Sequence, residues 1–224
     1  MIKNPIKNFL FLIFFFFSNN AFCFNYKPIH EFEIFRNNIK IGFHKLSFQS
    51  IEDKIVVNTQ IEMIIKLIEV IPVFKYFHEG TEIWINNQFV EAKTFTKKNS
   101  KEFKFTAKRK GSKIEIKSRG KVFLVDGDTL ITSYWQQNWF KKRILIDSQH
   151  GKKRLINVEK KGFEKIKTSN TTIFAQKYKV TGTQDKPNGK KIDYEIWYDE
   201  AGRWVKIKFF VQKSLIEYFL VTEY

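Results

Sequence analysis

The sequence predicts a mainly all-β fold, in the form of one large curved antiparallel sheet or open half-barrel. From Ile29 onward, apolar and polar residues alternate in segments of strand length, so successive side chains fall on opposite faces of a strand. Residues suited to chain reversal separate these segments, as at Asn86 and Asn87 and between Lys110 and Ser112. We therefore expect strands with one polar face and one apolar face that a core must cover.

The first 23 residues have the organisation of a secretory signal peptide. Lys3 and Lys7 precede an apolar run over residues 9–17, which is too short to cross a bilayer because a helical span takes about 20 residues. We expect cleavage near Cys23, a periplasmic or secreted protein, and one β-rich domain over residues 24–224. The absence of a Pro/Gly/Ser-rich linker favours this single domain.

Cys23 is the single cysteine of the chain. Phe22 is bulky where a lipidation signal has a small residue, so we do not expect a lipid anchor at Cys23. Cleavage after Cys23 would leave a mature chain without disulfides or zinc-thiolate sites. Its stability would then come from the core.

The longest alternating segment runs from Lys54 to Leu67, with an apolar residue or threonine at every second position from Ile55. The apolar parity changes after Leu67, which predicts a bulge or bend near Glu69, just before Pro72. The other strands predicted by alternation are Lys40 to Phe48, Gly80 to Ile85, Phe89 to Thr96, Lys101 to Arg109, Lys113 to Ser118, Lys153 to Glu159, Phe163 to Thr168, Thr172 to Thr181, Lys191 to Tyr198, Arg203 to Val211 and Leu215 to Val221.

The stretch from Asp128 to Phe140 breaks the alternation. Leu130, Tyr134 and Trp139 have a spacing that suits one or two helical turns after a capping Thr or Ser. We predict one short helical insertion near residues 128–140, packed against the curved sheet.

The net charge of +17 and the isoelectric point near 9.8 raise the question of an anionic partner. Arginine, which reads phosphate best because its planar fork binds two oxygens, is scarce among the 40 basic residues. Abundant Lys, Phe, Ile and Asn are also typical of a chain encoded by an AT-rich genome. We therefore expect no nucleic-acid partner, but peripheral attraction to an anionic membrane surface, worth roughly 1 kcal/mol per basic residue close to it.

Five segments together resemble a family of small exported bacterial proteins, the domain of unknown function 6134. They are IKIGFHKLSF (39–48), YFHEGTEIWINNQFVEAKTFT (76–96), TSYWQQNW (132–139), LIDSQHGK (145–152) and YEIWYDEAGRWVKIKF (194–209). The chain departs from the family in having DTLIT before SYW, where a proline and a glycine are usual. The resemblance implies an exported β-rich protein, more distantly like the half-barrels of lipoprotein carriers, and implies no activity.

Two Glu-Ile-Trp strands suggest a binding surface. Alternation places Glu82 and Trp84 on one face of their strand, and Glu195 and Trp197 on one face of theirs. An acidic group beside a large amphipathic ring suits a cavity for an amphiphile, and we predict that these four residues contribute to one. The alternative is structural: each tryptophan covers the core and each glutamate pairs with a cross-strand lysine.

The SYW segment between these strands carries Tyr134 and Trp135, which we add to the candidate ligand-binding residues because irregular loops often hold functional groups. The alternative is that both rings plug one end of the barrel. Ser133 lies in no Gly-x-Ser-x-Gly elbow, so nothing marks it as a nucleophile.

Four histidines remain, and none has the spacing of a metal site with another: His30, His44, His78 and His150. We therefore predict no metal, no cofactor and no catalytic residue. The sequence does not indicate an oligomeric state.

Three functions stay open at this point. The first is a non-enzymatic envelope protein that binds a lipid or other amphiphile in its curved sheet. The second is a structural or assembly factor that offers a sheet edge to an envelope protein. The third is a hydrolase-type enzyme that uses His78 or His150 with a nearby carboxylate.

Overall fold

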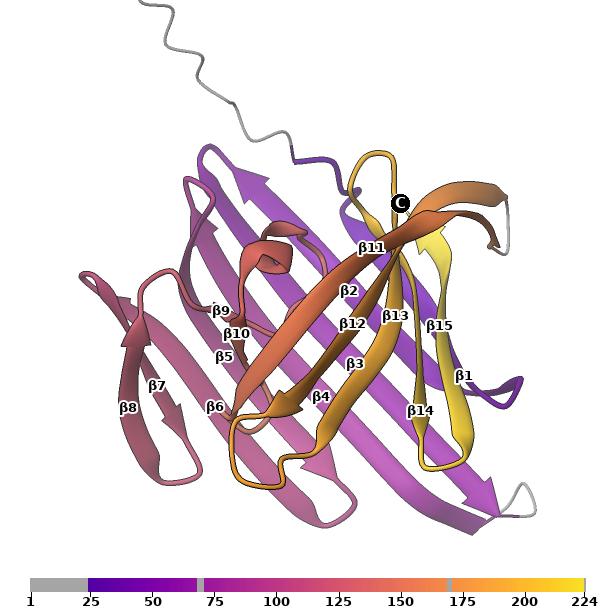
Figure 1. Ribbon diagram of the computed structural model, residues 1–224, viewed down its shortest axis with the longest axis horizontal. Coiled ribbons are helices and arrows are strands. Elements are labelled where there is room, and N and C mark those ends of the chain that lie inside the picture. The colour runs from indigo at the N-terminus through magenta and orange to yellow at the C-terminus, as the bar shows by residue number, and fades with distance from the viewer. Residues whose placement is uncertain (1–23, 68–70, 169–170, 224) are drawn as a thin grey trace, which may run out of the picture.

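The computed structural model describes residues 24–67, 71–168 and 171–223. The predicted signal peptide and the predicted bulge at Glu69 therefore lie outside the described residues. Fifteen strands form one continuous sheet, which confirms the predicted large curved antiparallel sheet. Figure 1 shows the sheet curled on itself, with β11 to β15 passing in front of β1 to β5.

The first half of the chain forms eight strands that pair in sequence order as hairpins. They are β1 (Ile29–Arg36), β2 (Ile39–Ile51), β3 (Lys54–Leu67), β4 (Ile71–Ile85), β5 (Gln88–Lys98), β6 (Lys101–Lys110), β7 (Lys113–Ser118) and β8 (Lys121–Asp126).

The second half begins with short elements and then returns to long strands. The elements are β9 (Leu130–Ile131), the 3-10 turn η1 (Asn138–Lys141), β10 (Ile144–Ile146), β11 (Lys153–Lys167), β12 (Thr172–Gln184), β13 (Lys191–Asp199), β14 (Trp204–Val211) and β15 (Ser214–Glu223).

A pairing between the two ends of the chain joins these halves. β1 is antiparallel to β15, with Ile34 opposite Tyr218, so the strand order runs from β8 through β1 and β15 to β9. Within the described residues, β8 and β9 are the two edges, and the barrel stays open between them.

Local sequence explains the tight hairpins. Asn86 and Asn87 have φ values of 49° and 59°, the left-handed pair that a two-residue hairpin turn requires and that asparagine tolerates. Pro72 lies in β4, although a proline is disfavoured in a central strand. It is accommodated because β5 begins to pair with β4 only at Tyr76, so Pro72 has a neighbour on the β3 side alone.

The predicted helical insertion is smaller than expected. Only the four residues of η1 are helical, while Leu130 and Ile131 form a parallel bridge with Leu145 and Ile146. The predicted strands at 153–159 and 163–168 are one strand, β11, with a register shift between Lys160 and Phe163. Strand β8 escaped the sequence prediction because Val122 and Leu124 make its outer face apolar as well, which hides the alternation.

The segment from β9 to β10 fills the interior of the half-barrel. Trp135 contacts Trp84 of β4 at a ring distance of 5.5 Å, whereas Phe140 contacts Tyr178 of β12 at 4.3 Å. The segment is thus held between the two walls of the sheet, as Figure 1 also indicates. Among the described residues, no helix reaches the length and hydrophobicity that a membrane crossing requires.

Candidate functional site

A polar cavity of about 110 Å³ lies inside the half-barrel, between β2 to β5 and the middle segment. Two histidines and a carboxylic acid from the sheet line it, namely His44 from β2 and His78 and Glu82 from β4. All three are buried in a core that is otherwise rich in aromatic rings. Buried polar groups of this kind need hydrogen-bond partners, so the contacts of each one define what the cavity can do.

Strand register brings these groups together. His44 lies opposite Ile61 of β3, and Ile61 lies opposite His78, so the two histidines stand in one row of inward-facing side chains. The next row contains Gly80, which has no side chain to fill the space beside it. A Cβ atom at Gly80 would lie 2.9 Å from the Cγ2 atom of Thr94. Glycine at this position therefore helps to keep the cavity open.

His44 is the least satisfied polar group of the cavity. Neither of its ring nitrogens has a hydrogen-bond partner among the described residues. Its neighbours are rings, with centroid distances of 5.2 Å to Trp204 and 5.9 Å to Tyr218. Burial lowers the pKa of His44 to about 3, so the imidazole is neutral at neutral pH. One N–H donor and one nitrogen acceptor thus remain unpaired, at roughly 1–3 kcal/mol each.

His78 has one partner in the sheet. Its Nδ1 atom lies 2.7 Å from the Oγ1 atom of Thr96 on the neighbouring strand β5. Burial lowers the pKa of His78 to about 4, against the opposing charge of Asp147. The imidazole of His78 is therefore neutral as well, which gives the cavity a second uncharged ring.

Glu82 is an acceptor shared by several donors. Its Oε2 atom accepts hydrogen bonds from the indole nitrogens of Trp84 at 3.0 Å and of Trp135 at 3.4 Å. Burial raises the pKa of Glu82, while hydrogen bonds from Ser133 and the two tryptophans act in the opposite direction. The carboxyl group thus joins the wall of the sheet to the middle segment.

Hydroxyl groups fix the far side of the cavity. The Thr94 hydroxyl donates to the Ser148 carbonyl oxygen at 2.6 Å, which attaches β5 to the segment after β10. The Oγ1 atom of Thr132 accepts a hydrogen bond from the Ser148 backbone N–H at 3.1 Å and lies 3.2 Å from its Oγ atom. These groups satisfy one another and position the lining.

Four of the six predicted ligand-binding residues meet in this region. Glu82, Trp84 and Trp135 share the hydrogen bonds described above. Tyr134 lines the cavity and packs against Trp204 at a ring distance of 5.5 Å. Its carbonyl oxygen accepts a hydrogen bond from the Tyr198 hydroxyl at 2.7 Å. Tyr134 and Trp135 therefore also fill the barrel interior, as the structural alternative predicted.

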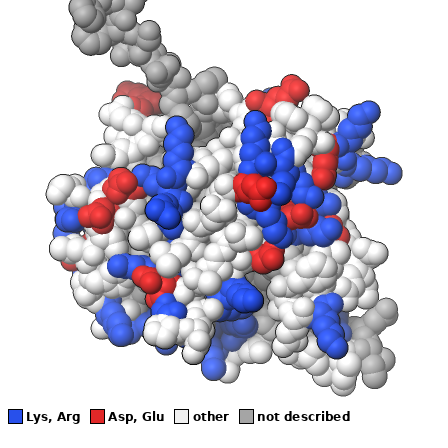
Figure 2. Space-filling model, in the orientation of Figure 1, with Lys and Arg blue, Asp and Glu red and all other residues white. Residues whose placement is uncertain are grey.

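The other two predicted residues, Glu195 and Trp197, do not line this cavity, and this corrects the expectation of a common site. They lie on the outer face of β13, because the alternate residues Ile196 and Tyr198 fill the interior. The Trp197 indole donates to the Glu164 carboxylate at 3.0 Å. Figure 2 shows lysines and acidic residues side by side on this face of the molecule.

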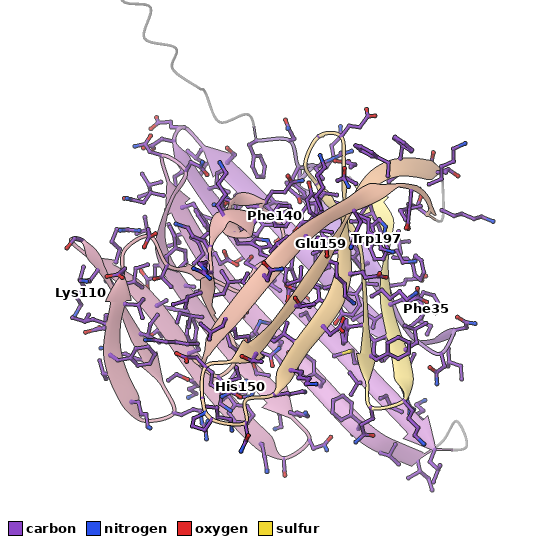
Figure 3. All side chains as sticks on the ribbon, in the orientation of Figure 1. Phe35, Lys110, Phe140, His150, Glu159 and Trp197 are labelled. Atoms are coloured by element: carbon purple, nitrogen blue, oxygen red, sulfur yellow. The ribbon has the colours of Figure 1, made fainter. Side chains whose placement is uncertain are left out.

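Lysine side chains cover the Trp197 ring, which is labelled in Figure 3. The Nζ atoms of Lys177 and Lys206 each lie 5.2 Å from the ring centroid. Lys177 also forms an ion pair with Glu195 at 2.9 Å. This arrangement corresponds to the structural alternative, in which the tryptophan is covered and the glutamate pairs with a cross-strand lysine.

A separate buried carboxylate lies at Asp147, after β10. Arg154 Nη2 is 2.5 Å and His150 Nδ1 is 3.2 Å from its Oδ2 atom. Burial would raise the pKa of Asp147, but the His150 hydrogen bond and the Arg154 charge outweigh it and hold this pKa well below its usual range. His150 lies near the lower end of the half-barrel in Figure 3 and rests on the ring of Phe103.

In the sequence, His44 is one of four histidines without metal-site spacing. Its position opposite Ile61 depends on strand register, and no local motif marks it. The part of the chain that the structure describes contains no group of three or more His, Cys, Asp or Glu side chains that could hold a metal ion.

Comparisons with known proteins support the fold and name no activity. A family model described as Domain of unknown function (DUF6134) matches residues 32–221. A solved structure, the crystal structure of a beta-barrel-like protein of domain of unknown function DUF1849 from Brucella abortus, is similar with a TM-score of 0.58 and 11% sequence identity. The match covers 89% of this chain and 99% of that chain, and it shows the fold alone. No curated protein matches the sequence.

Proposed function

Because the chain belongs to the family described as Domain of unknown function (DUF6134), whose description names no activity, we propose its function from the interior cavity. The protein is an exported, non-catalytic binding protein of the cell envelope. Its half-barrel holds the polar end of a small amphiphile in the cavity beside His44.

The observation that carries this proposal is the pair of unpartnered nitrogens on His44. In native structures the large majority of buried side-chain polar atoms have at least one partner, so two on one ring require an explanation. A ligand with a hydroxyl or amide group could accept from one nitrogen and donate to the other. Binding would then give both buried nitrogens of His44 a hydrogen-bond partner.

The charges of the lining residues indicate whether the polar end of the ligand is charged. Among the described residues of the lining there is no lysine or arginine, His44 and His78 are neutral, and burial raises the pKa of Glu82. A phosphate or carboxylate would enter without a cationic partner, which is unfavourable in a buried site. The polar end of the ligand is therefore uncharged.

The walls and the size of the cavity define the rest of the ligand. Trp204, Tyr134 and Ile61 offer apolar surface next to the polar groups. A volume of about 110 Å³ lies below the roughly 300 Å³ at which typical small-molecule sites begin. The cavity receives the polar end of a small amphiphile as it stands, whereas a long acyl chain would require Tyr134 and Trp135 to move.

Export to the periplasm or beyond the cell is part of the proposal and rests on the signal-like sequence of residues 1–23. Fractionation of native cells, with the N-terminus of the purified protein determined by mass spectrometry, tests it. A mature chain that begins near Phe24 is expected. A cytoplasmic protein with an intact N-terminus would refute export.

The binding function is tested by purifying the mature protein from its native host and extracting it for mass spectrometry. His44→Phe keeps the ring volume but removes both nitrogens, and Trp197→Phe alters a buried ring on the outer face as a control. We expect a small uncharged amphiphile with the wild-type and Trp197→Phe proteins, and its loss from His44→Phe. The proposal fails if no amphiphile co-purifies and a crystal structure shows only water beside His44.

The alternative function, an assembly factor for an envelope protein, is favoured by the edge strand β8. Val122 and Leu124 on its outer face are 62% and 60% exposed, and among the described residues β8 pairs only with β7. Such an edge can accept a further strand from a partner. Photo-crosslinking from position 122 in intact cells tests this alternative, and absence of any protein adduct would count against it.

A further inference from the structure

A second concave region, independent of the interior cavity, lies on the outer face of the sheet. It is a groove of about 710 Å³ that crosses β2 to β6 and ends at Ile29, the first residue of β1. Figure 1 shows the central strands β2 to β5 side by side at the back of the molecule. Neighbouring strands lie about 4.8 Å apart, so a groove across six of them is roughly 24 Å long. Its shape suits an elongated ligand that runs across the strands.

Strand register builds the floor of this groove from two adjacent rows of outward-facing side chains. In one row, Gln60 lies opposite both Lys45 and Glu79. In the other, Asn58 lies opposite Ser47 and Thr81. Each row therefore continues from strand to strand across the sheet. The floor is polar along its length, in contrast to the aromatic interior behind it.

The groove carries a net positive charge. Lys45, Lys93 and Lys104 line it, and Glu79 is the single acidic lining residue. Lys93 forms an ion pair with Glu91 at 2.9 Å. Lys45 and Lys104 have no ion pair within the described residues. The Gln60 row continues through Glu79 and Phe95 to Lys104, so Lys45 and Lys104 are two cations on either side of it that an anionic ligand could contact.

Gln60, the carboxylate of Glu79 and the ring of Phe95 lie between Lys45 and Lys104 in this row. Asn58, Gln60 and Thr81 offer amide and hydroxyl groups, and the Thr81 hydroxyl orients the Asn58 side chain by donating to its Oδ1 atom at 2.8 Å. Phe95 is half-buried and is supported from the side by Phe77 at a ring distance of 6.3 Å. Amides and hydroxyls match the hydroxyl groups of a sugar, and an aromatic face packs on the C–H face of its ring.

The position of the groove argues against other anionic ligands. Strands β2 to β5 are paired on both sides, so a peptide cannot bind there by adding a strand. None of the described residues that line the groove is an arginine, although arginine is the residue that reads phosphate bidentately and stacks on bases. The lysines, amides, hydroxyls and ring of the lining instead suit a hydroxyl-rich chain with spaced negative charges.

We propose that this outer groove binds an acidic polysaccharide chain, with Lys45 and Lys104 contacting its anionic groups and Phe95 packing against a sugar ring. The site does not depend on the interior cavity or on the ligand proposed for it. It would allow the protein to hold an anionic glycan on one face of the sheet while the interior remains closed.

Calorimetric titration of the mature chain, residues 24–224, with an oligogalacturonate long enough to span the groove of roughly 24 Å tests the proposal. The groove variant is Lys45→Gln with Lys104→Gln. The charge-matched control is Lys121→Gln with Lys213→Gln, two exposed lysines outside the groove. Phe95→Ala tests the ring contact separately. Thermal unfolding of each variant verifies that it is folded.

We expect the groove variant to bind about tenfold more weakly, which corresponds to 1.4 kcal/mol for two exposed charge contacts, while the control binds as the wild type does. Phe95→Ala should also weaken binding although it changes no charge. Equal losses in the two lysine variants would overturn the proposal, as would equal binding of polyglutamate, because either result indicates unspecific charge attraction. No binding of the oligogalacturonate, or binding of anionic phospholipid vesicles that the groove variant alone loses, would overturn it as well.

Discussion

The indole nitrogen of Trp135 lies 3.4 Å from the Oε2 atom of Glu82, and this contact joins the middle segment to the wall of the half-barrel. Trp84 donates to the same oxygen from the neighbouring inward position of β4. Because the carboxyl group is buried, each of these donors has lost its water. The middle segment is therefore held by polar contacts as well as by aromatic packing.

Replacement of Glu82 by leucine should destabilise the protein strongly. Two buried indole N–H groups would lose their acceptor, at about 1–3 kcal/mol each. Glu82→Gln keeps an acceptor oxygen in a similar volume and should remain within about 1 kcal/mol of the wild type. Urea unfolding followed by tryptophan fluorescence measures the difference. Equal stability of the two variants would contradict the role assigned to this contact.

Stability should decrease as the pH falls below 6.5. Burial lowers the pKa of His44 to about 3 and of His78 to about 4, so the unfolded chain binds protons at a pH where the folded chain does not. Their contribution is fully present above pH 6.5 and is lost progressively down to the folded pKa values. Each histidine should account for about 1.4 kcal/mol per pH unit in this window.

Urea titrations between pH 5 and pH 7.5 measure this slope. His44→Phe should reduce it to about half, because one of the two protonation sites is removed. The raised pKa of Glu82 acts in the opposite direction, since protonation of that carboxyl group favours the folded state. The comparison is therefore best made in a Glu82→Gln background. If the dependence of stability on pH were unchanged in His44→Phe, the lowered pKa of His44 would be contradicted.

The sequence predicted the fold because alternation is a local property. The face on which Ile55 and Val57 lie is buried as expected, and the paired asparagines at positions 86 and 87 form the turn that their chemistry favours. The helical insertion was overestimated because its aromatic residues are spaced for contacts with two walls of the sheet. That spacing resembles a helical period, but it arises from tertiary packing.

The lining of the candidate site could be predicted only in part. Glu82 and Trp84 are inward, whereas Glu195 and Trp197, with the same local pattern, are outward. Alternation separates the two faces of a strand but does not identify the inner one when both faces carry large rings, as at Trp197 and Tyr198. His44 could not be found in this way, because its importance depends on missing partners rather than on neighbouring residues.

Trp197 provides a test of this division between the two faces. Trp197→Ala should cost about 3–4 kcal/mol, because it removes a buried ring beneath Lys177 and Lys206. The interior cavity should keep its ligand, since the ring lies on the other side of the sheet. Denaturation measures the first effect and mass spectrometry of the purified variant the second. Loss of the ligand from a folded Trp197→Ala protein would contradict the geometry.

The pair of Asp147 and Arg154 should show a large coupling energy. Arg154→Met leaves a buried carboxylate without its cation, and we expect a loss of about 2–4 kcal/mol, somewhat below a fully buried pair because Arg154 retains 26% of its side-chain exposure. Asp147→Asn combined with Arg154→Met removes both charges, so this double variant should recover much of the stability. A double-mutant cycle of unfolding free energies measures the coupling. Additive losses would mean that the two charges do not interact, and that the depressed pKa of Asp147 has another cause.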